Sequence, residues 1–274
     1  MYEILVRFAE QISNITVGIV FFFLLALALE RLWPADKRTP LYHNETKFEI
    51  ATAYISLMVL WPIGMFVVNF ALLETLTHNI AHDFTSATIA SWPFAVKLFV
   101  CLLAMDLAVY THHRFAHRFL WPFHAIHHEA ENVNWSTAWR LHPLDFMLIL
   151  FDVIFLLFLG FPTDIILYAS TIVSVSSNLT HFNLDFKWKG PMKYLLISPH
   201  FHRWHHALDK KATDSNYCFV FPFLDSIFGT YYCPDEKPEA YGIFHKDVPK
   251  QYFFGKWTYP FRWQLENIKK FFSK

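Results

Sequence analysis

The sequence predicts an all-α protein: an integral membrane helical bundle of about four to five transmembrane helices, with a cytoplasmic helical cap that carries a histidine-rich dimetal site. Three observations lead to this prediction. Of the 274 residues, 54% are hydrophobic and only 17% are charged, whereas soluble domains average about 25% charged residues. Several apolar runs are long enough to span a bilayer. Twelve of the sixteen histidines lie between residues 112 and 206.

The composition also excludes several classes of protein. Disordered chains are rich in charge and poor in aromatic residues, but here 19% of the residues are aromatic. Cys101, Cys218 and Cys233 are too few and too scattered for a disulfide scaffold. The 23 basic residues balance 23 acidic residues, so we expect no nucleic-acid partner. The chain has no Gly-x-Gly-x-x-Gly motif and no P-loop, which argues against a nicotinamide or flavin site.

Five apolar segments are candidate membrane spans, because a hydrocarbon core of about 30 Å requires roughly 20 mostly apolar residues. They are residues 12–33, 48–73, 94–110, 144–162 and 164–180. The first has no basic start and no small-residue cleavage site, so we interpret it as an anchor and not as a signal peptide. Trp61 and Pro62 predict a kink in the second span. The Gly-Phe-Pro-Thr turn at residues 160–163 predicts a tight hairpin between the last two spans.

Basic residues are distributed unevenly around these spans. Five spans place segments 31–47 and 111–143 on the same side of the membrane as the chain after residue 181. Together these three segments contain 21 of the 23 Lys and Arg residues, leaving only Arg7 and Lys97. The positive-inside rule therefore predicts a multi-pass protein whose histidine clusters and C-terminal tail are cytoplasmic.

Most of the histidines in the central region form three clusters. The clusters are His113 with His117, His124 with His127 and His128, and His202 with His205 and His206. On a helix, residues spaced i, i+3 and i+4 share one face, so these spacings direct imidazoles toward a common point. Imidazole binds zinc, copper, iron and nickel, and eight rings exceed what one ion accepts. We therefore predict two metal ions. Structural zinc stays open at this point, although such sites are often rich in cysteine.

The motifs around these histidines resemble a known family. They are Asp106-Leu-Ala-Val-Tyr110 followed by His-Arg-x-x-His, then Leu-Trp-x-x-His-x-x-His-His, then Ser-Pro-x-x-His-Arg-x-His-His. Asp-Ser-Asn-Tyr at residues 214–217 and Asp-Ser-Ile-Phe-Gly-Thr at residues 225–230 complete the pattern. The pattern is similar to that of the sterol desaturase and fatty acid hydroxylase superfamily of integral-membrane di-iron oxidoreductases. Residues 129–140 are most similar to its alkylglycerol monooxygenase-like branch. Cys218 and the pair Ser226-Ile227 depart from the usual pattern.

The resemblance implies a ligand set. The implied metal ligands are His113, His117, His124, His127, His128, His181, His202, His205 and His206. It also implies two iron ions, with O₂ as co-substrate and no catalytic residue beyond the ligands. His142 and Asp185 are further candidates whose role as ligands the resemblance leaves open. Asp106, Glu129, Glu131 and Asp225 are candidates to orient the ligand rings.

The resemblance further implies hydroxylation or desaturation of a C–H bond in a lipid taken from the bilayer, such as a sterol, a fatty acyl chain or an ether lipid. Aldehyde decarbonylation with the same ligands is a further possibility. A cytochrome, ferredoxin or separate reductase would supply electrons. The alternative is a non-catalytic metal-binding membrane protein, either a transporter or a sensor. We divide the chain into N-terminal transmembrane helices at 1–93, a hydroxylase-like catalytic domain at 94–232 and an interfacial tail at 233–274, where residues 255–274 predict an amphipathic helix.

Overall fold

The structure, a computed structural model, describes residues 2–67, 86–244 and 253–272. Within these ranges the ordered elements are helices, and the only β-type pairings are two isolated bridges, Pro34 with Leu184 and Ala207 with Tyr241. The all-α prediction is therefore confirmed for the described part of the chain. Residues 68–73, the end of the second predicted span, lie outside it.

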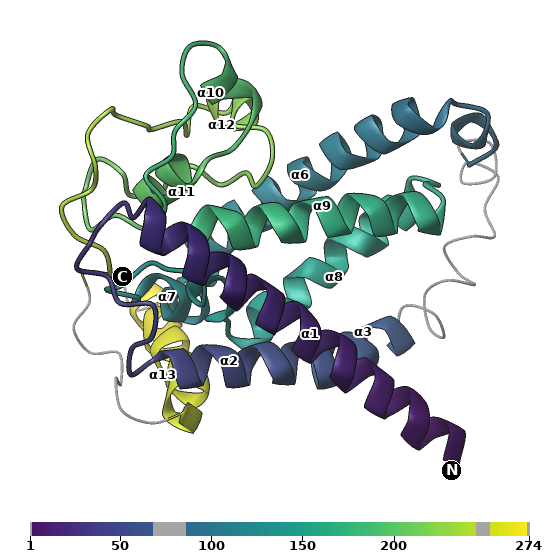
Figure 1. Cartoon of the computed structure of the whole chain (residues 1–274), viewed down its shortest axis with the longest axis horizontal. Helices are drawn as coiled ribbons and strands as arrows, with labels where there is room; N and C mark the ends of the chain where they lie inside the picture. The colour runs from purple at the N-terminus through teal and green to yellow at the C-terminus, as the bar shows by residue number, and fades with distance from the viewer. Residues whose placement is uncertain (1, 68–85, 245–252, 273–274) are drawn as a thin grey trace.

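Three helices form the apolar body of the molecule: α6 (Phe94–Phe119), α8 (Pro143–Phe158) and α9 (Thr163–His181) (Figure 1). Both α8 and α9 pack against α6. Buried side chains from all three, among them Met105, Leu156 and Ile165, form one hydrophobic cluster. In the described part of the chain, α6 is the one helix whose length and apolar composition suit a membrane crossing. The count of four to five spans stays a prediction.

The expected hairpin between α8 and α9 is present. The turn contains Gly160, whose φ of +83° is a conformation that residues with a Cβ rarely adopt. A Cβ added there would also lie 2.9 Å from the backbone nitrogen of Ser86. Glycine is thus required both by the turn and by the close approach of another segment.

The N-terminal region contributes α1 (Tyr2–Leu32), α2 (Thr46–Ile55) and α3 (Trp61–Val67). A π-helical turn, Ser56–Leu60, connects α2 to α3, and it ends just before the Trp61-Pro62 pair at which the sequence predicts a kink. Pro62 cannot donate a backbone hydrogen bond, which accounts for an irregular turn before it. Phe182, after α9, packs with residues of α1 and α2 in a second cluster.

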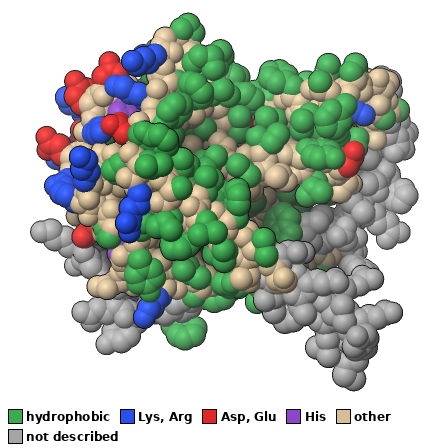
Figure 2. All heavy atoms as spheres, viewed as in Figure 1, with side chains coloured by type: hydrophobic (Ala, Val, Ile, Leu, Met, Phe, Trp, Pro, Cys, Tyr) green, Lys and Arg blue, Asp and Glu red, His purple; other side chains and the backbone are tan. Residues whose placement is uncertain are grey.

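Several short helices and the 20-residue helix α13 form a cap at one end of this body. They are α7 (Trp121–His128), the 3₁₀ turn Thr137–Trp139, α10 (Met192–Leu195), α11 (Pro199–His205), α12 (Phe223–Ile227) and α13 (Phe253–Phe272). The C-terminal ends of α6 and α9 reach the same end of the molecule (Figure 1). Charged side chains gather there, while hydrophobic side chains cover much of the remaining visible surface (Figure 2).

Two buried carboxylates fasten the loop at residues 217–221 to the body and the cap. Asp106 of α6 accepts hydrogen bonds from the backbone amides of residues 219–221 at 2.7–3.1 Å. Asp225 of α12 accepts from the amides of Tyr217 and Cys218 at 2.8 and 3.0 Å. The expectation that these two acids contact histidine rings directly is therefore wrong. Their oxygens satisfy buried backbone donors, whose positions depend on the folded loop.

Replacement of Asp106 by Leu is expected to destabilise the protein. Each of the three amides would lose its acceptor in a buried setting, at about 1–3 kcal/mol per amide. We expect the thermal midpoint of the detergent-solubilised chain to fall by ~10 °C or more. In Asp106→Asn the thermal midpoint should fall less, because one acceptor oxygen remains. The exposed control Asp235→Asn should unfold as the wild type does. An unchanged midpoint for Asp106→Leu would contradict this role.

Candidate metal centre

The nine histidines that the sequence singles out converge in the cap, where they form two groups. The first group contains His113, His117, His124, His128 and His205, and the second contains His127, His181, His202 and His206. Within each group, one ring nitrogen from every member lies within 4.8 Å of the others. The rings come from the ends of α6 and α9 and from α7 and α11.

Local structure explains how these rings reach a common centre. His113 and His117 lie one turn apart near the end of α6, and the chain then breaks at Leu120, the cap shared by α6 and α7. Pro122 lies in the first turn of α7, where the backbone amides have no acceptor within the helix, so the amide hydrogen that proline lacks is not needed there. At α11, the side chain of Ser198 caps the helix by accepting a hydrogen bond from the amide of Phe201 at 3.3 Å.

Each His-x-x-His-His motif divides between the two groups. In α7, His124 and His128 join the first group while His127 joins the second. In α11 the division is reversed: His205 joins the first group, and the remaining two rings, at 202 and 206, join the second. The i, i+4 pair of each motif therefore stays together on one helix face, and the third ring belongs to the neighbouring group.

Within the groups the Nε2 atoms face one another. Nε2 of His113 lies 3.1 Å from Nε2 of His124, and Nε2 of His127 lies 3.2 Å from Nε2 of His181. Other Nε2 pairs are His117 with His128 at 3.1 Å, His202 with His181 at 2.9 Å and His206 with His181 at 3.2 Å. The Nε2 atom of His205 is buried and has no hydrogen-bond partner within the described residues.

The opposite ring nitrogen, Nδ1, contacts an oxygen in six of the nine rings. The backbone acceptors are the carbonyls of Tyr217 for His113, Arg140 for His127, Ser177 for His181 and Ser215 for His205, at 2.6–3.3 Å. The carboxylate partners are Asp214 for His117 and Asp145 for His124, both at 3.3 Å. Because a carbonyl can only accept, Nδ1 carries the proton and the Nε2 lone pair faces inward.

This tautomer makes the arrangement fit a metal. In the pair formed by His127 and His181, both Nε2 atoms are unprotonated, so their lone pairs face each other across an Nε2–Nε2 distance of 3.2 Å. Burial and neighbouring rings keep the pKa of His127 well below its usual value, so protonation does not relieve the repulsion. A cation placed among the lone pairs would do so, and imidazole nitrogen is a preferred donor for iron and zinc. The residues present therefore fit bound metal ions.

Four further rings of the two groups share this electrostatic setting. Burial, with the nearby rings as a second cause, holds the pKa of His128, His202 and His206 well below the usual value. Burial also lowers the pKa of His205, to about 3. These rings stay neutral at physiological pH, and neutrality is the state in which imidazole binds a metal.

Asp145 and Asp214 were not among the acids that the sequence suggested as ring partners. Asp145 follows a His-Pro pair at the start of α8, and Asp214 adopts a positive φ of 60° in the loop after α11. Neither position has a sequence spacing that links it to its histidine, because both contacts join distant segments. Glu129, which was suggested, instead binds Arg140 and Lys256. The suggestion for Glu131 stays a prediction.

The other candidate ligands have different partners. His142 caps α8 by accepting from the amide of Leu144 at 3.0 Å, and its Nε2 contacts the carbonyl of Trp257. Asp185 forms an ion pair of 2.7 Å with Lys237 on the exposed surface. Neither belongs to the two histidine groups.

A cavity adjoins the first histidine group. It holds about 680 Å³ of empty space, including its open mouth, and His117, His128 and His205 all line it. Trp121 and Asp214 form part of its wall. Every histidine that lines this cavity belongs to the first group, so the two groups differ in what adjoins them.

Comparisons with known proteins identify relatives of this chain. Ornithine lipid hydroxylase OlsE of Rhizobium tropici is 31% identical over 146 residues, which are 52% of this chain and 44% of that protein. Alkylglycerol monooxygenase of Homo sapiens is 27% identical over 189 residues, 61% of this chain and 39% of that protein. A very-long-chain aldehyde decarbonylase of Oryza sativa subsp. japonica is 29% identical over 132 residues, 43% and 20% of the respective chains.

The chain spans less than half the length of each of these relatives. No solved structure gives a significant match. Residues 98–230, which contain all nine converging histidines, match the fatty acid hydroxylase family. This part of the chain therefore belongs to the fatty acid hydroxylase family, and the relatives of the chain include an ornithine lipid hydroxylase and an alkylglycerol monooxygenase.

Proposed function

We propose that this protein is a membrane-bound, O₂-dependent di-iron oxidoreductase that hydroxylates or desaturates a C–H bond of a lipid. The observation that carries the proposal is the convergence of nine imidazoles into two adjacent groups at the charged end of an apolar helical body. A set of four or five nitrogen donors for each ion leaves an open position on a six-coordinate metal. Open positions are typical of catalytic sites and not of structural zinc sites.

In this proposal each histidine group holds one iron. Bound iron would supply the redox chemistry that activates O₂ for attack on an unactivated C–H bond. The chain itself keeps the rings in the correct tautomer, through the six Nδ1 contacts described above. The carboxylates of Asp145 and Asp214 also make His124 and His117 stronger donors. Burial of the rings excludes water, which would otherwise compete for the open positions.

The substrate would reach the site from the bilayer. The two hydroxylating relatives carry the names of an ornithine lipid and an alkylglycerol, which supports a lipid substrate here. The cavity beside His117, His128 and His205 offers space for the reacting part of such a molecule. A cytochrome, ferredoxin or reductase, as a separate chain, would supply electrons at the cytoplasmic end.

Metal analysis tests the ligand set. After anaerobic reconstitution, the wild type should hold about two irons per chain and His127→Ala about one, because the second group would retain only three of its rings. The control His200→Gln alters a histidine that contacts the carbonyl of Pro234 and belongs to neither group, so it should keep both irons. An active wild-type sample that contains only one structural zinc would contradict the proposal.

Lipid analysis of cells that express the wild type or His127→Ala tests the reaction. Hydroxylation predicts that one lipid class gains an oxygen atom only with the wild type, whereas desaturation predicts the loss of two hydrogen atoms. An aldehyde decarbonylase would instead shorten a chain by one carbon. If no lipid class differs between the two cell lines, the non-catalytic alternative, a metal transporter or sensor, is favoured.

The acids behind two rings provide a further prediction. Asp145→Asn should lower metal affinity or turnover by about 10–100-fold, which is typical when the partner of a ligating histidine is lost. Asp214→Asn should have a smaller effect, because the Asp214 side chain is 64% exposed and water can replace it. The comparison is made by titration with metal and by turnover on the same samples, with Asp235→Asn as the exposed control. If both variants have the metal affinity and the turnover of the wild type, the role assigned to these acids is contradicted.

A further inference from the structure

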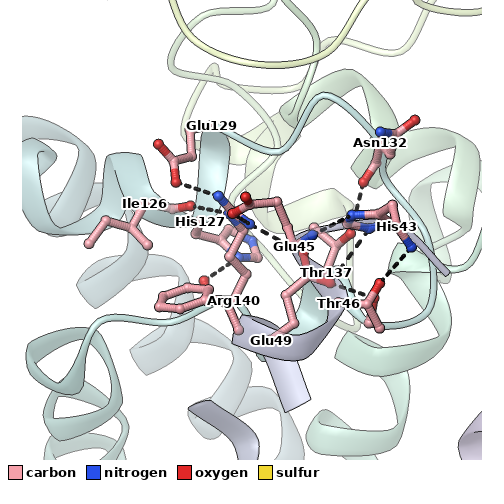
Figure 3. A network of polar contacts seen from close by, with 12 residues as sticks. His43, Glu45, Thr46, Glu49, Ile126, His127, Glu129, Asn132, Thr137 and Arg140 are labelled. Atoms are coloured by element: carbon pink, nitrogen blue, oxygen red, sulfur yellow. Dashed lines mark hydrogen bonds and ion pairs between the residues drawn. The ribbon is translucent and has the colours of Figure 1, made fainter. Parts of the chain in front are cut away.

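A cluster of charged side chains, all buried except the partly exposed Glu45, lies beside His127 (Figure 3). Glu45 and Glu49 come from the start of α2, Glu129 follows α7, Arg140 follows the 3₁₀ turn, and Lys256 belongs to α13. Arg140 and Lys256 are only 2% and 3% exposed. Burial of a charge costs several kcal/mol unless partners compensate for it, so the contacts within this cluster matter.

The guanidinium of Arg140 is surrounded by carboxylates. Its Nη1 donates to Glu45 at 3.1 Å and to Glu49 at 3.4 Å, and its Nη2 donates to Glu129. Burial opposes the charged form of Arg140, but the three carboxylates outweigh it and keep the pKa above its usual value. The arginine is thus permanently charged and held from three sides, which gives its backbone a fixed position.

Arg140 contacts the His127 segment at two points. Its Nε donates to the carbonyl of Ile126 at 2.7 Å, and that carbonyl belongs to the peptide bond that leads into His127. The backbone carbonyl of Arg140 lies 3.3 Å from Nδ1 of His127. The first contact fixes the backbone that carries the histidine. The second fixes the rotation of its ring and its tautomer.

We propose that Arg140 is a positioning residue for the second histidine group, which sets the orientation of His127 for metal binding. The inference deepens the proposed function and rests on its assignment of metal to the nine histidines. Asp145 and Asp214 act on rings of the first group only. For the second group, the contacts of the Arg140 side chain fix the position of the Arg140 carbonyl, which is the hydrogen-bond acceptor for the ring of His127.

Lys256 extends this arrangement to α13. Its Nζ contacts Glu45 at 2.6 Å and Glu129 at 2.5 Å, so the lysine and Arg140 share two carboxylates. Both cations also lie over the ring of Phe48, with Nζ of Lys256 at 5.1 Å and Cζ of Arg140 at 5.5 Å from its centroid. The C-terminal helix is therefore connected to the second group through the same carboxylates. We expect loss of Lys256 to weaken the same metal position.

Titration of the full detergent-solubilised chain with Co²⁺ tests the inference, because histidine-bound Co²⁺ has a visible absorption spectrum. The wild type should bind two equivalents. In Arg140→Lys, which keeps the charge but cannot donate to Ile126 and the carboxylates together, the affinity for one equivalent should fall by about 10–100-fold. The other equivalent should bind as in the wild type. The spectrum of the weakened equivalent should change, and His127→Ala should lose that same equivalent.

Two further variants make the result decisive. Lys256→Met keeps the aliphatic stem and should weaken the same equivalent to a smaller degree; if Arg140→Lys does not fold, this variant decides by the same criterion. Lys237→Met is the control, because it removes an exposed lysine of the cap and should leave both equivalents unchanged. The inference is overturned if Co²⁺ binds Arg140→Lys and Lys256→Met as it binds the wild type, or if both equivalents weaken equally in them. A wild type that binds fewer than two equivalents would instead overturn the proposed function.

Discussion

The structure depends on one electrostatic constraint: unprotonated Nε2 atoms of neutral histidines, such as those of His127 and His181, face one another at 3.2 Å. Such an arrangement is repulsive unless a cation lies among the lone pairs. It persists only if each ring is prevented from turning its protonated nitrogen inward. For His113, His127, His181 and His205, a carbonyl oxygen behind the ring prevents this rotation. Other contacts in the cap hold the backbone segments that carry these carbonyl oxygens.

Ser177 belongs to α9, but the other three acceptors, the carbonyls of Tyr217, Arg140 and Ser215, come from loops, and these loops need anchors. The carbonyl of Tyr217 faces His113 because Asp225 holds the amide of the same tyrosine and Asp106 holds the residues that follow. Arg140 plays a similar part for His127, since three carboxylates and the carbonyl of Ile126 fix its own position. Asp106, Asp225 and Arg140 therefore act on the candidate metal ligands indirectly. They hold backbone segments, and those segments hold rings.

Much of this could be predicted from sequence, for identifiable reasons. Short-range spacing determines which histidines share a helix face, so the three clusters and the break between α6 and α7 could be predicted from the sequence. The family resemblance added His181. The roles of Asp145, Asp214 and Arg140 depend on contacts between segments far apart in the chain, and no local pattern encodes them. For the same reason Asp106 was assigned to a ring when its partners are amides more than a hundred residues away.

The division of each His-x-x-His-His motif has a consequence for the two metal positions. The first group adjoins the cavity and contains both rings with carboxylate partners, whereas the second is backed by carbonyl oxygens and by the Arg140 cluster. Carboxylates make imidazole a stronger donor than carbonyls do, so the two ions would differ in electron density. Because α7 and α11 each supply rings to both groups, a shift of either helix would change both positions together. The different surroundings would thus give two bound ions different properties, and the shared helices would keep the ions at a fixed separation.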